Sequence, residues 1–295
     1  MLKCLSRAIS ASLAAAALAM AAWANAGQAP SPDFSVTLLV FNRPPYYLLD
    51  HGRPAGGFLL DIALAAFERA GIAVEVKEMP PNRILAAVKD HEAPVCSVGW
   101  LATSERETAA RFSSPFYQNK PIGVVVNAQS PLPSGQPATL DDLLQKNATW
   151  GLHEGFSYGE DIDKKFRRQP ASALKRFSDA RHMVRLVALN RLDAVPIEPE
   201  ELAWMQHEEP ALAGSLRFVP LADAPSGIMR RIMCHTAVPQ TVMDRLDAAI
   251  AGYRETDDYR RLVGQGTPDA PALPAAAGGH DDRRYNSPSS NRWEK

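Results

Sequence analysis

The sequence predicts an α/β protein built on parallel β-sheet. Three apolar runs indicate buried strands, at 35–40, 72–76 and 95–98, and two stretches with helical character, 57–70 and 83–88, lie between them. Strands that alternate with helices in this way form β-α-β units with a parallel sheet. The chain has 295 residues, 46% of them hydrophobic, which is enough for one two-lobed domain or two ordinary ones.

The first strand, 35–40, is followed by a stiff aromatic loop, Arg43-Pro-Pro-Tyr-Tyr47. Open α/β sheets bind their ligands at the carboxyl ends of the strands. We therefore expect Arg43 and Tyr46 at the rim of a ligand site, with Arg83, at the start of the second helix, flanking the same rim. The ring of Tyr46 can line the site or pack inside the protein.

The first helix, 57–70, carries a buried stripe. Its apolar residues recur at i, i+3, i+4 and i+7, at Leu60, Ala63, Leu64 and Phe67. Gly71 ends the helix, and the strand 72–76 follows directly. The sequence therefore predicts a helix whose apolar face packs against the sheet.

The third strand ends at a glycine turn. Apolar and β-branched residues at 95–98 are followed by Gly99 and Trp100, which we expect at the carboxyl edge of the sheet. The ring of Trp100 can line a ligand site or pack within the protein, as for Tyr46.

A short helix begins after this turn, at Thr103 or Ser104. Ser104 and Glu107 fit the Ser-x-x-Glu capping pattern. Arg106 therefore lies in the first helical turn, beside backbone N–H groups that have no intrahelical partner. A cation beside unpaired donors is an anion-binding arrangement.

The N-terminus has the pattern of a secretion signal. Lys3 and Arg7 precede an apolar run at 11–22, and Ala24-Asn25-Ala26 fits a cleavage site made of small residues. The apolar run is too short and too rich in alanine for a membrane anchor. We expect cleavage after Ala26 and export to the periplasm.

Two cysteines remain after that cleavage, Cys96 and Cys234. Each lies in an apolar, strand-like run, and exported proteins fold in an oxidising compartment. An even number of cysteines there favours a disulfide, and the alternative is two separate buried thiols.

Charge and motif content argue against several functions. A formal net charge of −1 gives no electrostatic basis for binding nucleic acid. The seven histidines are scattered and neither remaining cysteine lies in a C-x-x-C, so we expect no metal site. No phosphate loop or Gly-x-Ser-x-Gly elbow occurs, so we expect no catalytic residues and no cofactor. The short basic pairs are expected to be solvated, at Arg167-Arg168, Arg230-Arg231 and Arg260-Arg261.

The stretch 95–117, with its strand, glycine turn, Thr-x-x-Arg, short helix and Phe-Ser-Ser-Pro-Phe-Tyr, resembles the signature of bacterial extracellular solute-binding proteins of family 3. These receptors deliver polar amino acids and similar solutes to ABC importers. The resemblance extends over 35–263. It implies the two-lobed periplasmic-binding-protein fold of type II, in which each lobe is a mostly parallel sheet flanked by helices and two crossing segments form the hinge.

The same resemblance divides the chain. The implied parts are a signal peptide at 1–26, a first lobe at 27–118 and 227–265, a second lobe at 119–226, and a disordered tail at 266–295. The tail is rich in Pro, Ala, Gly and charged residues, which is typical of a solvated segment.

Several ligand contacts of the family correspond to residues of this chain. Arg106 corresponds to the arginine that binds the ligand's carboxylate. The tract 153–157 is similar to a loop whose amides and hydroxyl meet that carboxylate, where Ser157 matches and Phe156 replaces the usual threonine. Glu198 lies where an acidic residue pairs with the ligand's ammonium group in amino-acid binders. It can equally be an acidic helix start, favoured by the helix dipole.

Three positions that are polar in relatives are apolar here, at Leu59, Leu101 and Phe156. A site that lacks a hydrogen-bonding partner discriminates against a ligand's polar group. We therefore expect the site to disfavour glutamine, histidine and similar amino acids and to prefer one anionic group on a more apolar or aromatic body, unless bound water replaces the lost hydroxyls. The candidate ligand-binding residues are Arg43, Tyr46, Arg83, Gly99, Trp100, Arg106, Phe156, Ser157 and Glu198.

The expected function is periplasmic binding of a small, polar, carboxylate-bearing solute by lobe closure. The partner would be an inner-membrane ABC permease, the protein would act as a monomer, and it would not be an enzyme. One alternative is a periplasmic receptor that reports to a sensor protein without a role in transport. Another is a lyase similar to cyclohexadienyl dehydratases, with Glu198 or His153 as the acid or base.

Overall fold

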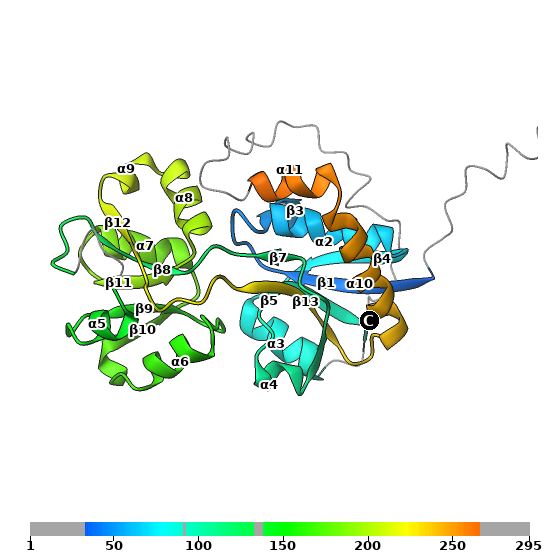
Figure 1. The fold of residues 1–295 in the computed structure, drawn as a ribbon, viewed down its shortest axis with the longest axis horizontal. Helices are drawn as coiled ribbons and strands as arrows, with labels where there is room; N and C mark the ends of the chain where they lie inside the picture. Colours follow the sequence, from blue (N-terminus) through cyan, green and yellow to red (C-terminus); the bar gives the residue numbers. More distant parts are fainter. Residues whose placement is uncertain (1–32, 91–92, 133–137, 266–295) are drawn as a thin grey trace, which may run out of the picture. The chain divides into compact units, whose positions relative to one another are not determined.

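The computed structural model describes residues 33–90, 93–132 and 138–265. The predicted signal peptide and C-terminal tail lie outside the described residues. The described part contains two larger sheets, each covered by its own helices, and a small hairpin of β2 (Leu48–Asp50) and β3 (Arg53–Gly56) (Figure 1). This arrangement confirms the predicted two-lobed α/β fold. Within the described residues, none of the helices is long and apolar enough to cross a membrane.

The first lobe is built on a mixed sheet. In spatial order its main strands are β4 (Ile72–Glu78), β1 (Phe34–Val40), β5 (Val95–Trp100), β13 (Met229–His235) and β6 (Ala110–Phe112), and β7 (Tyr117–Gln118) also pairs with β13. The strands β4, β1 and β5 run parallel, as the alternation of strands and helices predicts. The strand β13 is antiparallel to β5 and β6, because it is where the chain returns to this lobe.

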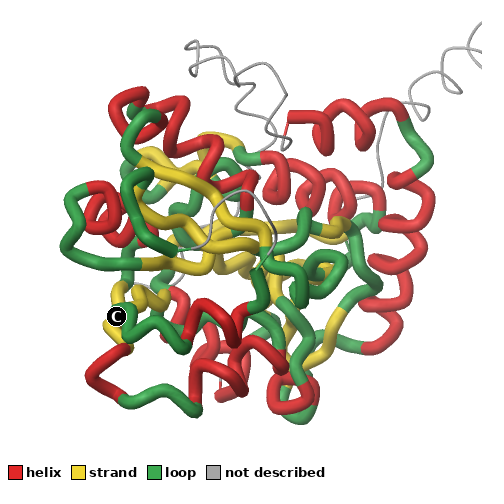
Figure 2. Tube along the Cα trace, turned by 60° about the vertical axis from the view of Figure 1, so that its left-hand side comes forward, coloured by secondary structure: helices red, strands yellow, loops and turns green. Residues whose placement is uncertain are grey.

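Helices cover both faces of this sheet (Figures 1 and 2). They are α2 (Phe58–Arg69), α3 (Pro81–Asp90), α10 (Gln240–Arg254) and α11 (Asp257–Gln265). Leu38 packs with α2 and α10, whereas its neighbour Leu39 packs with Ile84 of α3 on the other face. Successive strand residues point to opposite faces, so a strand buried on both faces is a continuous apolar run.

The second lobe has a mixed sheet of its own. In spatial order the strands are β10 (Leu174–Phe177), β9 (Trp150–His153), β11 (Ala194–Ile197), β8 (Gly123–Asn127) and β12 (Leu216–Pro220). The strands β10, β9 and β11 are parallel, and β8 is antiparallel to both of its neighbours. One face packs against α5 (Leu140–Leu144) and α6 (Glu160–Arg167), and the other against α7 (Ala180–Ala188), α8 (Pro199–Glu208) and α9 (Pro210–Ala213).

Two segments connect the lobes and lie side by side. One joins β7 to β8, and the other joins β12 to β13 (Figure 1). Gln118 pairs with Met229, and the N–H of Asn119 donates to the carbonyl of Ile228 at 3.0 Å. Gly227 has φ +125°, and a Cβ there would lie 1.8 Å from the Asn119 carbonyl oxygen, so only glycine permits this approach.

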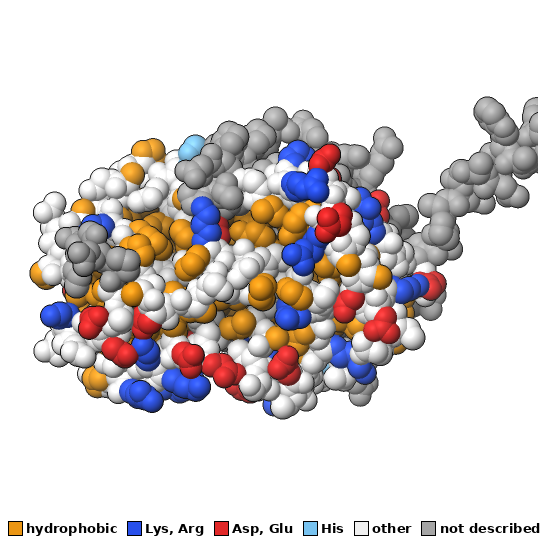
Figure 3. Space-filling view, viewed as in Figure 1, with side chains coloured by type: hydrophobic (Ala, Val, Ile, Leu, Met, Phe, Trp, Pro, Cys, Tyr) orange, Lys and Arg blue, Asp and Glu red, His pale blue; other side chains and the backbone are white. Residues whose placement is uncertain are grey.

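The surface carries charges of both signs. On the face shown in Figure 3, basic (blue) and acidic (red) side chains are interspersed, with apolar side chains between them. This face therefore offers no continuous basic surface of the kind that binds nucleic acid.

The two cysteines are bonded to each other. Cys96 on β5 lies directly opposite Cys234 on the antiparallel strand β13, and the Cα atoms are 4.0 Å apart. Both residues are fully buried. The disulfide confirms the favoured interpretation of the sequence over two separate thiols.

Removing this cross-link is expected to destabilise the protein. The bond joins residues 138 positions apart. In the chain-entropy model such a long loop stabilises by about 4–5 kcal/mol. The Cys96→Ala/Cys234→Ala variant should lose about that much unfolding free energy in urea titrations, and the wild-type protein kept in reductant should behave alike. An unfolding free energy equal to that of the oxidised wild type would contradict the expectation.

Candidate functional site

The residues that follow strands of both lobes converge on one site. A small cavity of about 30 Å³, here called the inner cavity, lies at the carboxyl ends of β1, β5, β9 and β11. It is lined by Phe41, Arg43, Tyr47, Val98, Gly99, Trp100, Leu101, Arg106, Phe156, Ser157, Tyr158, Glu198 and Arg230. This is the edge at which α/β sheets bind ligands.

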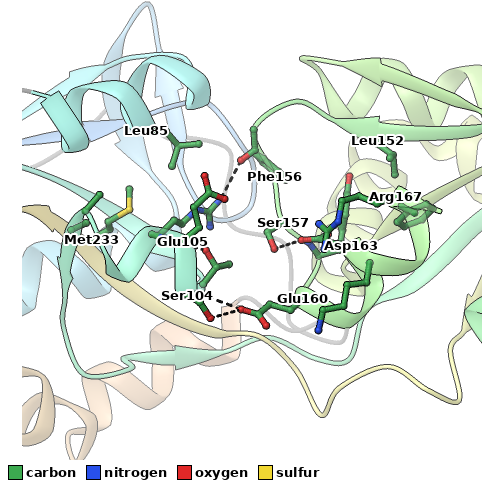
Figure 4. A pocket seen from close by; sticks show the side chains of 18 of the residues that line it. Leu85, Ser104, Glu105, Leu152, Phe156, Ser157, Glu160, Asp163, Arg167 and Met233 are labelled. Atoms are coloured by element: carbon green, nitrogen blue, oxygen red, sulfur yellow. Dashed lines mark hydrogen bonds between the residues drawn. The ribbon is translucent and has the colours of Figure 1, made fainter. Parts of the chain in front are cut away.

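A larger space of about 900 Å³, the outer cleft, adjoins the inner cavity. Arg106, Phe156, Ser157 and Tyr158 line both. Figure 4 shows its two sides, with Leu85 and Met233 on the first lobe facing Leu152 on the second. A ligand held at Arg106 can therefore extend into the outer cleft.

Arg106 lies between the lobes. Its guanidinium donates to the Leu101 carbonyl at 3.0 Å and to the Gly155 carbonyl of the second lobe at 3.2 Å. It also lies over the ring of Trp100, 4.9 Å from the centroid. Burial lowers its pKa, and no carboxylate among the described residues forms a salt bridge with it. A partly buried cation whose hydrogen bonds go to carbonyl groups, and not to a carboxylate, is suited to receiving an anion.

The cap of the short helix α4 (Ser104–Glu107) differs from the prediction. Thr103, rather than Ser104, is the N-cap, and its hydroxyl accepts from the Arg106 N–H at 3.3 Å. The Ser104 hydroxyl instead donates to Glu160 of the second lobe at 2.8 Å (Figure 4). Both hydroxyl residues are suitable N-caps, and the Ser-x-x-Glu spacing favoured Ser104, since Arg106 stands three residues after Thr103.

Glu198 is the centre of a buried ion network. One carboxylate oxygen binds Arg43 and the other binds Arg230. Arg43 also donates to Glu201 through Nε at 3.0 Å and Nη2 at 2.8 Å. Every side chain in this network is less than 10% exposed.

The network gives Glu198 a role that neither interpretation of the sequence named. It is the N-cap residue of α8, but its side chain makes no cap hydrogen bond. Burial acts to raise the pKa of Glu198, and the charges of Arg43 and Arg230 outweigh burial, so the pKa lies below its ordinary value. Burial raises the pKa of Glu201. The carboxylate of Glu198 is therefore ionised and already paired.

Arg230 corrects a sequence prediction. The pair Arg230-Arg231 was expected to be solvated, but Arg230 is 7% exposed. Its guanidinium donates to the Asn119 side chain, to Glu198, and to the Gly99 carbonyl at 2.9 Å. Arg230 shares a strand face with two buried residues, Ile232 and Cys234. That alternation is the signal that could have revealed it.

Aromatic rings surround Arg43. Its guanidinium lies 4.9 Å from the ring centroid of Tyr46 and 4.4 Å from that of Phe156. Phe156 also stacks on His153, with centroids 3.8 Å apart, and meets the edge of Phe41. Phe156 of the second lobe therefore covers residues of the first. Tyr46 is fully buried beneath the network and does not line the inner cavity.

Gly99 has a structural reason to be glycine. Its φ is +78°, and a Cβ there would lie 1.7 Å from the hydroxyl oxygen of Tyr47. That hydroxyl donates to the Val98 carbonyl at 2.9 Å, next to the carbonyl that accepts from Arg230. Gly99 thus contributes close packing and a backbone acceptor.

Ser157 lies at the site, but its hydroxyl is engaged. It donates to Asp163 at 2.5 Å and accepts from the Gly159 N–H at 3.3 Å, which fixes the start of α6 (Figure 4). Arg83 is exposed on α3 and lines neither the inner cavity nor the outer cleft. The structure thus brings seven of the nine candidates to the inner cavity and leaves Tyr46 and Arg83 outside it.

Sequence reasoning missed part of the cavity lining. Phe41, Tyr47, Val98, Leu101, Tyr158 and Arg230 were not candidates. All but Arg230 lie within two residues of a predicted candidate, so the strand ends did locate the region. Among the described residues, no group of His, Cys, Asp and Glu could hold a metal ion.

Comparisons with known proteins place the chain among the solute-binding proteins. The sequence profile of the bacterial extracellular solute-binding proteins, family 3, matches residues 38–265. A probable histidine-binding protein of Neisseria gonorrhoeae is 23% identical over 263 residues, which cover 86% of this chain and 92% of that protein.

Solved structures share the fold. The arginine-, lysine-, histidine-binding protein ArtJ of Geobacillus stearothermophilus superposes with a TM-score of 0.66 at 19% identity, covering 86% of this chain and all of that one. A histidine kinase sensor domain with similarity to periplasmic binding proteins superposes with a TM-score of 0.65 at 18% identity, covering 80% of this chain and 96% of that one. At such identities the likeness concerns the fold.

Truncating Glu198 is expected to be costly. Glu198→Ala leaves two buried arginines facing each other, and breaking a buried pair in this way costs about 3–5 kcal/mol of unfolding free energy. Glu209→Ala is the matched control, because Glu209 also binds two arginines, Arg181 and Arg185, but at the surface. Denaturant titrations should show a large loss for Glu198→Ala and a much smaller one for Glu209→Ala. Equal losses of unfolding free energy in the two variants would show that burial does not make the ion pairs of Glu198 more important than those of Glu209.

The same carboxylate predicts a pH dependence. The pKa of Glu198 in the folded protein lies below its ordinary value of 4.5, so its stabilising contribution is complete above that value and is lost as pH falls through the folded pKa. The difference in unfolding free energy between wild type and Glu198→Gln should therefore shrink between about pH 6 and about pH 3. A difference that stays constant over this range would show that the pKa of Glu198 is the same in the folded and unfolded states.

Proposed function

The chain belongs to the bacterial extracellular solute-binding proteins of family 3, and on that premise we propose that it is exported and binds a small, carboxylate-bearing solute between its lobes for delivery to an ABC importer. In this proposal the predicted signal peptide at 1–26 directs the protein to the periplasm. The lobes are those predicted, 27–118 with 227–265 and 119–226, and the two connecting segments act as the hinge. The protein acts by binding and release, without chemistry on the solute.

The observation that carries the proposal is the environment of Arg106. Its guanidinium is directed into the space between the lobes and is held by two carbonyl groups rather than by a carboxylate. A partly buried arginine that has no carboxylate partner among the described residues favours a carboxylate ligand, which it can bind through two parallel hydrogen bonds. Because Arg106 reaches the Gly155 carbonyl, an anion bound there would contact both sides of the cleft.

The remainder of the cavity favours an apolar or aromatic body on that solute. Leu101 and Phe156 both line the inner cavity, and the rings of Phe41 and Trp100 lie beside them. Leu59 is buried in the core of the first lobe and does not line the inner cavity.

A related receptor role remains the alternative. The same fold occurs in a histidine kinase sensor domain, so the protein can instead report solute binding to a sensor. Uptake of a radiolabelled ligand by cells with and without the gene separates the two: loss of uptake supports transport, and unchanged uptake with an altered transcriptional response supports sensing.

The binding proposal is tested by Arg106→Ala. Carboxylates are first screened by thermal shift, and the best ligand is then titrated by calorimetry. The variant should lose at least about 2 kcal/mol of binding free energy, roughly 30-fold in affinity, because the buried carboxylate is left unpaired.

Arg83→Ala is the matched control, since Arg83 is an exposed arginine of the same lobe that lines neither the inner cavity nor the outer cleft. Its affinity should equal that of the wild type. If Arg106→Ala also binds with wild-type affinity, Arg106 does not hold the ligand.

A further inference from the structure

We propose that the ligand carries its carboxylate without a neighbouring ammonium group, as in an unsubstituted, 2-hydroxy or 2-keto acid, because Glu198 is already paired with Arg43 and Arg230. This inference rests on the proposed function and narrows its substrate class. It concerns the position at which amino-acid binders of the family hold the ammonium group of their ligands.

The first argument is the balance of charge. Among the described residues, the ionisable groups with full charge that line the inner cavity are Arg43, Arg106, Arg230 and Glu198. Three cations thus surround one anion. From outside the inner cavity, Glu201 offsets the charge of Arg43, and the charges of Asp163 and Glu105 act on Arg106. Within the cavity itself the cations predominate, so they attract an incoming anion and repel an ammonium group.

The second argument is the supply of acceptors. An ammonium group has three N–H donors and no acceptor. The carbonyl groups at the end of β5 already accept, Val98 from Tyr47, Gly99 from Arg230 and Leu101 from Arg106. The Gly155 carbonyl, across the cleft, also accepts from Arg106. Donors are plentiful here and unengaged acceptors are not, which is the composition of an anion site.

The third argument is the position of Glu198 itself. Each of its two oxygens is bound to a different arginine. Each oxygen keeps a further lone pair, but an ammonium group bound there would lie beside a guanidinium of the same charge. Displacing that guanidinium would relieve the repulsion and leave it buried without its carboxylate. Arg43 is the easier one to displace, because it keeps Glu201 as a partner. Arg230 would keep only the Asn119 side chain and the Gly99 carbonyl.

The volume of the inner cavity supports the same class of ligand. The inner cavity, at about 30 Å³, has room for little more than a small polar group. The body of the ligand must then lie in the outer cleft, which Arg106 and Phe156 also line. Apolar residues of the outer cleft, among them Leu85, Phe156 and Leu174, can contact a hydrocarbon or aromatic body, although charged residues such as Lys89, Glu105 and Arg176 line the cleft as well (Figure 4).

The experiment compares acids that differ only in the amino group. Purified protein is titrated calorimetrically with phenylalanine, 3-phenyllactate and 3-phenylpropanoate, and with leucine, 2-hydroxy-4-methylpentanoate and 4-methylpentanoate. In at least one series the acids without nitrogen should bind at least about tenfold more tightly than the amino acid. Equal or tighter binding of the amino acid in both series would overturn the inference while leaving the proposed function intact. The proposed function is decided separately by the thermal-shift screen of carboxylates, and it fails if no carboxylate binds there.

A charge-neutral variant tests the role assigned to the ion network. Arg43→Gln/Glu201→Gln removes one cation and one anion, so that Glu198 keeps only Arg230. The affinity for the amino acid, relative to that for the acid without nitrogen, should rise at least about tenfold in this variant. Arg83→Gln should leave this ratio unchanged. An unshifted ratio in a folded double variant, as judged by circular dichroism, would show that Arg43 does not exclude the ammonium group. If the variant does not fold, the ligand series decide the question on the wild-type protein.

Discussion

The structure depends on a buried carboxylate that must be paired. Glu198 lies at the start of α8, and an unpaired charge in that position would cost several kcal/mol. Its partners come from two distant parts of the first lobe, Arg43 from the loop after β1 and Arg230 from the strand β13. One side chain of the second lobe thereby fixes where two segments of the first lobe lie. The fold around the cleft is arranged to satisfy this one charge.

The same helix end also contacts a connecting segment. Glu200, two residues on, accepts from the Tyr117 hydroxyl at 3.1 Å and from the Lys120 N–H at 2.8 Å. Arg230 in turn binds Asn119, which also donates to the Tyr46 hydroxyl. Movement of one lobe relative to the other would therefore disturb the ion network and the connecting segments together. The ion network at the ligand site and the connecting segments that form the hinge are therefore joined by hydrogen bonds.

Much of this could be predicted from the sequence, for local reasons. Strands and helices follow from apolar periodicity, and the positions of Arg106, Phe156 and Glu198 follow from strand ends and from the family motif. The hydrogen bonds and ion pairs of the network around Glu198 could not be predicted, because they join residues that are distant in sequence. Arg230 and Asn119, for example, are 111 positions apart. Charge alone suggested a solvated Arg230, whereas its strand register buries it. The role of Glu198 was ambiguous for the same reason, since a glutamate can stand at the start of a helix or form an ion pair, and the sequence does not show which.

The departures from the family pattern are linked to each other. Where relatives place a threonine on the second-lobe loop, Phe156 offers Arg43 an aromatic face 4.4 Å away. That contact, like the bond from Arg43 to Glu198, joins the two lobes within the protein. In a receptor that holds an amino acid by both its charged groups, the ligand itself makes this bridge. Here the protein supplies the bridge through Arg43, so the ligand needs to supply only the anion for Arg106. The ring of Phe156 and the carboxylate of Glu198 thus contact the same arginine, and the specificity that we propose depends on both contacts.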